Sequence, residues 1–254
     1  MRAQVHVVSL PDADQRRDAF AAQPHAGLVP WSFHDAHTRL QDPLRVVERE
    51  AVVHTGRLLT RGELGCYSSH HALWRRLLDD PDHDAYLVLE DDVVVDWPLV
   101  RDLLALDLRE FDIDYLRLYQ KRPSSFVVRR RPVVCRDYAI VELFGRPYGT
   151  QAYLLTRATA QVFASTTLVT RPVDDFMDRW WDHGVPNFAL FPSPVMERHN
   201  VSGIGDDRYG HESTAEHLAW ARRDEWRRRW AFASRRLRTS ERLRQLRQRL
   251  GDGR

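Results

Sequence analysis

The sequence has few cysteines and no long apolar run. Cys66 and Cys135 are the only cysteines in 254 residues, too few for a disulfide framework or a clustered zinc motif. A reducing, cytoplasmic setting is therefore the simplest expectation. No uninterrupted apolar stretch approaches the roughly 18 residues of a membrane span, and residues 1–10 lack the apolar core of a secretory signal. The 43% of hydrophobic residues excludes a mainly disordered chain and suffices for a substantial core.

Charge is distributed unevenly along the chain. The net charge is +2, but residues 221–254 hold thirteen arginines against four acidic residues, a net charge of +9. The first 220 residues therefore carry −7. A mildly acidic body does not predict nucleic-acid binding, which makes a nucleic-acid partner unlikely on composition, although the tail leaves that hypothesis open.

Strand-like and helix-like segments alternate, which is typical of an α/β domain. The segment Thr60-Arg61-Gly62-Glu63 fits a capping box, and the apolar stripes after it predict a buried helix over residues 61–79. The continuous apolar run at residues 85–89 predicts a central strand that is covered on both faces. We expect one α/β domain over residues 1–205 and a helical, arginine-rich extension over residues 206–254.

Three carboxylates, Glu90, Asp91 and Asp92, directly follow this predicted central strand. In open α/β sheets, ligands bind beyond the carboxyl ends of the strands. Adjacent acids repel one another, so clustering them at the edge of a core is unfavourable unless a cation lies there. Oxygen ligands suit Mg²⁺ or Mn²⁺, which in turn suit a diphosphate. The alternative is a solvated turn after the strand, and the triplet alone leaves both interpretations open.

Further candidate ligands each have a structural alternative. Arg16 and Arg17 follow the predicted first strand, where either could bind a phosphate or lie on a solvated helix face. Asp35 ends a predicted strand and is a candidate for binding a ribose or base. His70 lies on an apolar stripe of the predicted helix, so a hydrogen-bonded core histidine is the favoured interpretation over a ligand.

Five short blocks, in the same order, resemble glycosyltransferase family 25, which includes bacterial lipooligosaccharide and collagen galactosyltransferases. The similarity spans roughly residues 4 to 195, and the blocks are Val8-Ser9-Leu10 with Arg16-Arg17, Phe33-His34-Asp35-Ala36, residues 59–74 with Glu90-Asp91-Asp92, residues 149–157, and Pro172-Val173-Asp174. The sequence departs from the family pattern at Gln151, and nothing aligns after Pro194.

The resemblance implies a GT-A fold with a mixed central sheet flanked by helices, a nucleotide-sugar donor and a divalent metal, Mn²⁺ or Mg²⁺. It implies donor contacts by Ser9, Leu10, Arg16, Arg17, Asp35, His70, Glu90, Asp91 and Thr150. Metal ligands are expected at Asp92 and Asp91, with His199 as a third, since many GT-A enzymes have a ligand after the last strand.

Asp174 is the expected general base, with Asp175 as the second candidate. Asp174 belongs to the block that resembles the family's Pro-Val-Asp, in the first turn of a helix that Pro172 would begin. A helix N-terminus lowers the pKa of a carboxylate and weakens it as a base, so partial burial must offset that effect. The alternative, that both acids only cap the helix, stays open.

These observations together predict an inverting glycosyltransferase. It would move a hexose, with galactose the leading expectation, from a UDP-sugar to a hydroxyl of a cell-surface glycan, a lipid-linked glycan or a peptide. The alternative is a metal-dependent nucleic-acid-binding or nuclease-like protein that uses the acidic triplet and the basic tail. A third hypothesis is an inactive sugar-binding relative.

The tail carries its own prediction. Trp226, Trp230, Ala233 and Leu237 recur at helical spacing, and arginines fill most of the other positions. Such a helix can lie on an anionic bilayer as a peripheral contact, here the inner face of the membrane. In the alternative, Trp226 and Trp230 pack back on the acidic body, and the sequence leaves both interpretations open.

Overall fold

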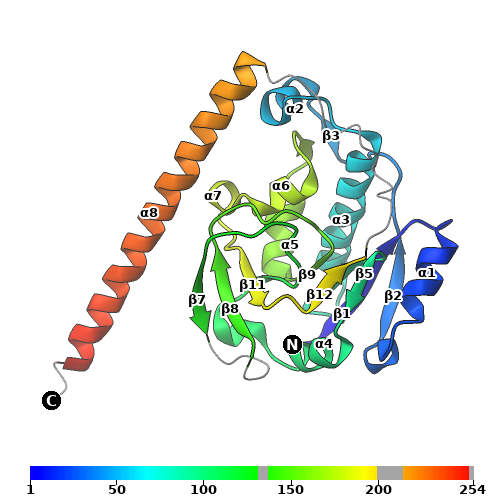
Figure 1. The fold of residues 1–254 in the computed structure, drawn as a ribbon, viewed down its shortest axis with the longest axis horizontal. Helices are drawn as coiled ribbons and strands as arrows, with labels where there is room; N and C mark the ends of the chain where they lie inside the picture. The colour runs from blue at the N-terminus through cyan, green and yellow to red at the C-terminus, as the bar shows by residue number, and fades with distance from the viewer. Residues whose placement is uncertain (131–136, 199–213, 252–254) are drawn as a thin grey trace.

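An eight-stranded mixed β-sheet forms the centre of the molecule (Figure 1). The computed structural model describes residues 1–130, 137–198 and 214–251, with side chains of the C-terminal helix as far as Arg235. The strands lie in the order β2-β1-β4-β9-β6-β11-β8-β7. Their bounds are β1 (Ala3–Ser9), β2 (Trp31–Asp35), β4 (Ala85–Glu90), β6 (Tyr115–Arg117), β7 (Phe126–Arg130), β8 (Ala139–Leu143), β9 (Ala152–Thr156) and β11 (Phe188–Phe191).

In the first half of the sheet, the ends of several strands lie at one edge. Strand β1 runs parallel to both β2 and β4, and its last residues pair with Asp35 and Glu90. The carboxyl ends of these three strands therefore lie together. Strand β9 runs antiparallel to β4, with Ala152 opposite Leu89, so the residues that precede β9 reach the same edge.

Helices cover both faces of the sheet, which confirms the expected α/β fold. Two helices pack their apolar side chains into the core on one face, α1 (Asp14–Ala21) and α4 (Trp97–Leu104). Three pack on the opposite face, α3 (Arg61–Asp79), α5 (Arg157–Ala164) and α6 (Val173–Asp178). The remaining short elements are α2 (Glu48–Thr55), α7 (Trp180–His183), β3 (Arg45–Val46), β10 (Leu168–Val169), and the turns η1 (Ala26–Leu28) and η2 (Leu108–Phe111).

Helix α3 begins as its sequence predicts. The Thr60 hydroxyl accepts a hydrogen bond from the backbone N–H of Glu63, and the Glu63 carboxylate accepts one from the N–H of Thr60, 2.9 Å away. Arg57 also donates to both Glu63 oxygens, over 2.8 and 2.6 Å. The capping hydrogen bonds and the Arg57–Glu63 ion pair together fix the N-terminal end of α3, which lies beside the site described below.

A small antiparallel ribbon extends the central strand past the acidic triplet. Its strands are β5 (Val93–Val95) and β12 (Val195–Glu197), and Glu197 pairs with Val93. The ribbon therefore places a residue from late in the chain beside Asp92. The predicted boundary at residue 205 lies outside the described residues, so the division into two parts stays a prediction.

The C-terminal helix α8 (Ala215–Gly251) packs its first turns on the body through a largely polar face. Asp224, 1% exposed, accepts hydrogen bonds from Arg179 and Arg146, and the Phe232 ring meets the Phe144 ring at 4.6 Å between centroids. The alternative that Trp226 and Trp230 pack on the body is wrong, because they are 74% and 69% exposed. They lie on the face of α8 that does not carry Asp224.

Helix α8 is the longest helix of the chain and runs away from the sheet (Figure 1). Within the described ranges, none of the helices combines the length and the apolar character that crossing a bilayer requires.

Candidate active site

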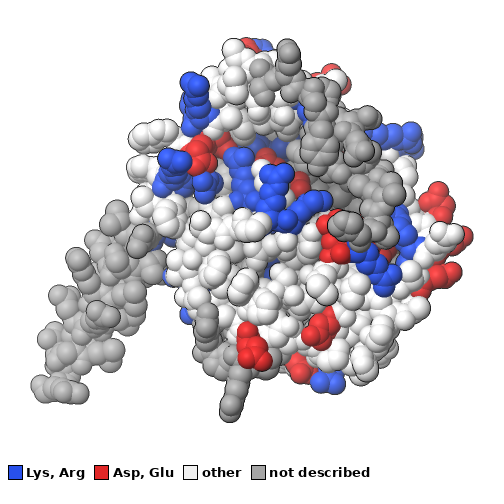
Figure 2. Space-filling model, in the orientation of Figure 1, with Lys and Arg blue, Asp and Glu red and all other residues white. Residues whose placement is uncertain are grey.

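A cleft of about 850 Å³ opens at the edge of the sheet where the carboxyl ends of β1 and β4 meet the residues before β9. Figure 2 shows basic side chains gathered around a hollow on this face, with acidic side chains beside them. Most of the predicted site residues line the cleft, namely Ser9, Leu10, Arg16, His70, Glu90, Asp91, Asp92, Thr150, Asp174 and Asp175. The structure thus brings together residues that are up to 166 positions apart in the chain.

Asp91 is held in place from β1 and α1. Its carboxylate is 4% exposed, and its Oδ2 atom accepts a hydrogen bond of 2.6 Å from the Ser9 hydroxyl. The Arg16 guanidinium lies 3.4 Å from Oδ1. Burial nevertheless raises the pKa of Asp91 above its ordinary value. Arg16 therefore faces the cleft beside a carboxylate, where it can meet a phosphate.

Asp92 has the chemistry of an incomplete cation site. Its Oδ1 atom is buried and has no hydrogen-bond partner among the described residues. Burial, followed by the charges of Glu90, Asp91 and Glu197, raises the pKa of Asp92 to about 7. A divalent cation would supply the missing partner and offset this repulsion, so the oxygen donors fit Mg²⁺ or Mn²⁺. The predicted third ligand, His199, lies outside the described residues.

Glu197 is an acid at this site that the sequence did not indicate. It accepts a hydrogen bond of 2.6 Å from the Tyr119 hydroxyl and lies 3.7 Å from the Lys121 ammonium group. The strand that carries it is three residues long, too short for a periodic signal. Only its antiparallel pairing with β5 reveals that it lies beside Asp92.

Arg17 and Asp35, both predicted to contact the donor, bind each other at the side of the cleft. The Arg17 guanidinium donates to Asp35 over 2.5 Å and to the carbonyl oxygens of Ser9 and Leu10 over 3.1 and 3.0 Å. These contacts tie the end of β2 to the end of β1. Neither side chain lines the cleft, and their predicted donor contacts stay predictions.

The loop before β9 lines the cleft, and its neighbours leave little room for a side chain at position 149. Thr150 donates a hydrogen bond to the Glu90 carboxylate. Gly149 has a φ of +86°, and a Cβ atom there would lie 2.4 Å from Gln151 Oε1 and 2.8 Å from the Tyr119 ring. Glycine is therefore required at position 149, both for the left-handed backbone and for the close approach.

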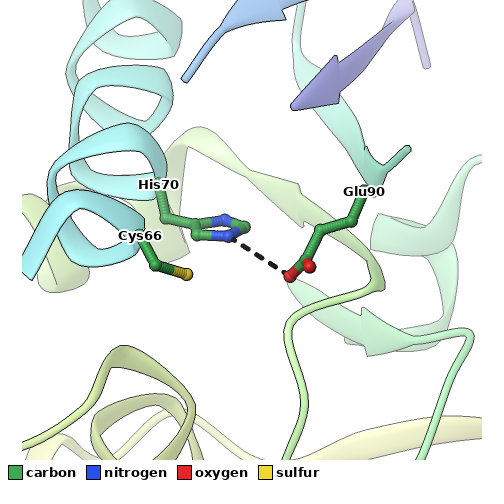
Figure 3. Close-up of side chains that lie close together, drawn as sticks. All are labelled: Cys66, His70 and Glu90. Carbon is green, nitrogen blue, oxygen red and sulfur yellow. Dashed lines mark ion pairs between the residues drawn. The ribbon is translucent and has the colours of Figure 1, made fainter. Parts of the chain in front are cut away.

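The two ring nitrogens of His70 have different surroundings, one in the core and one at the cleft. Its side chain is 0% exposed, and its Nδ1 atom lies 2.8 Å from the Tyr153 hydroxyl, which also accepts from Trp74 Nε1. Its Nε2 atom faces Glu90 at 3.7 Å, and it has no hydrogen-bond partner within the described part of the chain (Figure 3). The favoured core interpretation therefore accounts for only one of the two ring nitrogens.

Asp174 and Asp175 occupy the first turn of α6, as predicted, but their surroundings differ. Asp174 accepts hydrogen bonds from the backbone N–H groups of Gly149 and Asp175, yet burial and the neighbouring Asp175 charge raise the pKa of Asp174. The effect of burial thus exceeds that of the helix N-terminus. Asp175 forms ion pairs with Arg171 at 3.1 Å and Arg146 at 3.7 Å, so each oxygen of its carboxylate already faces a guanidinium group.

The class of protein follows from comparison with known families. The chain belongs to glycosyltransferase family 25, because the profile described as "Glycosyltransferase family 25 (LPS biosynthesis protein)" matches residues 2–177. This confirms the resemblance found in the sequence. The family match favours a transferase over the nuclease-like alternative.

Individual relatives are similar over different lengths. The chain is 28% identical over 233 residues to the lacto-N-neotetraose biosynthesis glycosyltransferase LgtB of Neisseria meningitidis serogroup B, covering 84% of this chain and 82% of LgtB. It is 29% identical over 146 residues to procollagen galactosyltransferase 1-B of Xenopus laevis, covering 53% of this chain but only 22% of that protein. A solved glycosyltransferase involved in glycosylation of the major capsid of PBCV-1 superposes with a TM-score of 0.34 at 11% identity, covering 72% of this chain and 69% of the other.

Proposed function

We propose that the protein is an inverting galactosyltransferase that moves galactose from a UDP-sugar to a hydroxyl group of a cell-surface glycan. The similarity to a procollagen galactosyltransferase supports the sugar, and the similarity to a lacto-N-neotetraose biosynthesis glycosyltransferase supports a glycan acceptor. One observation in the structure supports the chemistry most strongly. The acidic end of β4 and the half-buried Asp174 line the same cleft.

The acidic side of the cleft would bind the diphosphate of the donor. Asp91 and Asp92 would hold a divalent cation, which supplies positive charge to the leaving diphosphate when bound. Arg16 lies beside Asp91 and would hold a phosphate oxygen directly. The hydrogen bond from Ser9 orients the Asp91 carboxylate, so the anion-binding end of the cleft is fixed before the donor enters.

Asp174 would act on the acceptor. Its raised pKa makes it a stronger base than an ordinary carboxylate, whereas Asp175 is held by two arginines. In a single displacement, the acceptor oxygen forms a bond to the anomeric carbon as the bond from that carbon to the diphosphate oxygen breaks. The hydroxyl proton passes to Asp174, and the bonding electrons leave with UDP.

Hydrolysis of a panel of UDP-sugars tests this proposal without knowledge of the acceptor. The wild-type protein should release UDP slowly from UDP-galactose, and more slowly from UDP-glucose and UDP-N-acetylglucosamine. Release from none of the donors, with or without added Mn²⁺, would contradict the transferase proposal and favour an inactive sugar-binding relative.

We further propose that α8 holds the enzyme on an anionic membrane surface. Trp226 and Trp230 lie one helical turn apart and are largely exposed, which is unusual for side chains of this size. Exposed arginines flank them, including Arg227 and Arg229 at 61% and 76%. Tryptophan prefers the interface of a bilayer, and each basic residue near an anionic surface contributes about 1 kcal/mol.

Co-sedimentation with vesicles tests the membrane contact. The full chain should sediment with vesicles that contain phosphatidylglycerol and should not sediment with neutral vesicles. A Trp226→Ser/Trp230→Ser variant should lose most of this binding. Leu168→Ser is the matched control, because Leu168 is 55% exposed but belongs to β10 rather than to α8. Equal binding by the double variant, or a preference for DNA over vesicles, would contradict the proposal.

A further inference from the structure

Three side chains in the wall of the cleft converge on one point (Figure 3). The Cys66 Sγ, a ring nitrogen of His70 and a carboxylate oxygen of Glu90 all lie within 4.8 Å of one another. Cys66 and His70 are four residues apart on α3, so they project from the same face one turn apart. Glu90 ends β4 and meets them from the sheet. Neither the proposed cation site at Asp91 and Asp92 nor the proposed base uses this cluster.

We propose that Cys66, His70 and Glu90 form a second cation site, selective for a thiophilic divalent ion such as Zn²⁺. Thiolate, imidazole and carboxylate are the three ligand types that zinc takes in proteins. Two ligands spaced four residues apart on a helix, with a third from elsewhere in the fold, is a common way to hold that ion. The position left open would face the cleft.

The strongest single observation is the Nε2 atom of His70. The His70 side chain is 0% exposed, yet this atom has no hydrogen-bond partner in the described ranges of the chain and faces Glu90 at 3.7 Å. A buried ring nitrogen without a hydrogen bond is unfavourable, and the ion pair with Glu90 offsets this only when the ring is protonated, so a cation between the two groups is a better partner for the neutral ring.

The other ring nitrogen of His70, Nδ1, already has a hydrogen-bond partner of the kind that orients a metal-binding histidine. Nδ1 lies 2.8 Å from the Tyr153 hydroxyl, and Tyr153 is fixed in turn by a 3.0 Å hydrogen bond from Trp74. When Nε2 binds a cation, Nδ1 carries the proton and donates it to the Tyr153 oxygen. An outer hydrogen bond of this kind orients most metal-binding histidines. Thr150 similarly orients Glu90 through its hydrogen bond to the carboxylate.

The cluster must lose a proton and close slightly to hold the ion. Burial, followed by the carboxylates of Glu90 and Asp174, raises the pKa of Cys66 well above its ordinary value, so the free thiol keeps its proton. On binding, the thiol releases that proton to solvent, and the thiolate and Glu90 together balance the charge of Zn²⁺. Ligand atoms on one tetrahedral zinc lie roughly 3.5 Å apart, so the His70 and Glu90 atoms at 3.7 Å already fit, and the distances to Cys66 need to shorten by no more than about 1 Å.

Cobalt substitution of the full chain tests the proposal through a signal that only a thiolate ligand produces. Purified protein is stripped with chelator and titrated with Co²⁺, and the absorption from thiolate-to-cobalt charge transfer is recorded. Zn²⁺ affinity is then measured by competition. We expect one Co²⁺ with this absorption per chain, displaced by Zn²⁺, in the wild-type protein and in Asp92→Asn, which lacks an oxygen ligand of the other site.

Two cysteine variants separate the cluster from the rest of the chain. Cys66→Ser, a change of one atom, should abolish the absorption and weaken Zn²⁺ binding at least about tenfold. Cys135→Ser removes the other thiol of the chain and should behave as wild type. His70→Gln should lose the absorption as well, and circular dichroism shows whether that variant is folded.

Absence of the absorption in the wild-type protein would overturn the proposal. So would retention of wild-type Zn²⁺ affinity by Cys66→Ser, or loss of the absorption in Asp92→Asn, which would place the ion on the acidic triplet. The titration needs neither donor nor acceptor, so its failure would leave the proposed transfer reaction untouched.

Discussion

The Ser9 hydroxyl donates a 2.6 Å hydrogen bond to the Oδ2 atom of Asp91, 82 residues further along the chain. The bond joins the carboxyl ends of two parallel neighbouring strands, β1 and β4. It gives a buried carboxylate a fixed orientation at the point where the proposed cation and diphosphate would meet.

Removing this hydrogen bond should weaken cation binding without unfolding the protein. In Ser9→Ala, Asp91 loses a buried donor, so its charged form becomes less favourable and its orientation less fixed. We expect the apparent Kd for Mn²⁺ to rise about 10-fold, the lower end of the effect of losing an outer partner of a metal ligand. Calorimetric titration measures it, with Ser165→Ala, an exposed serine outside the cleft lining, as the control.

The two acids of α6 should respond differently to the same substitution. Asp174→Asn should lower kcat by about 10² to 10⁴, with donor binding unchanged, because it removes only the group that accepts the proton. Asp175→Asn should lower thermal stability instead, because Arg171 and Arg146 lose their partner. A kcat loss below about tenfold in Asp174→Asn, or the larger kcat loss in Asp175→Asn, would reverse the assignment.

Asp92 should reduce the stability of the metal-free protein. Its pKa in the folded state is about 7, above the ordinary value of 3.8, so the folded protein takes up this proton before the unfolded chain does. The resulting loss of stability is fully present above pH 7 and diminishes as the pH falls from 7 to 4. In EDTA at pH 8, Asp92→Asn should therefore be more stable than wild type, by about 1–3 kcal/mol.

Urea unfolding at pH 8 and at pH 4.5 checks this result. The advantage of Asp92→Asn should shrink toward zero at the lower pH. A variant that is less stable than wild type at pH 8 would show that the Asp92 charge is already compensated within the fold.

Asp224 should be the main anchor of α8. Asp224→Ala leaves Arg179, 3% exposed, without its buried partner, and breaking a buried pair from one side costs about 3–5 kcal/mol. Glu225→Ala, at the next position, removes only ion pairs with Arg228 and Arg229 along the exposed helix and should cost less than about 1 kcal/mol. Thermal unfolding of the two variants, side by side, measures the difference, and equal losses would contradict the anchor.

Much of the site was predictable because it follows local signals. The capping box at Thr60, the helix over residues 61–79 and the buried strand that ends in Glu90 each depend on residues within a few positions of one another. The acidic triplet was predicted from its place after that strand and Asp174 from the resemblance to the family's Pro-Val-Asp block, and the structure places them in one cleft.

Features that depend on pairing over long distances were not predictable. Glu197 reaches the cleft only because a three-residue strand pairs with β5, and Cys66 meets Glu90 only because α3 packs beside β4. The packing face of α8 was missed for another reason. It is built on a buried ion pair at Asp224 rather than on the apolar Trp226 and Trp230, so hydrophobic periodicity indicates the wrong face.

The most direct test of the proposed reaction is the rate of UDP release from UDP-galactose in chelator and after Mn²⁺ is restored, measured for wild type and Asp92→Asn. We expect wild type to be inactive in EDTA and to recover with Mn²⁺ or Mg²⁺, whereas Asp92→Asn should stay at least about 10²-fold slower at every Mn²⁺ concentration. A wild-type rate that is unchanged by chelator, or an Asp92→Asn rate equal to wild type, would contradict the central role given to the acidic end of β4.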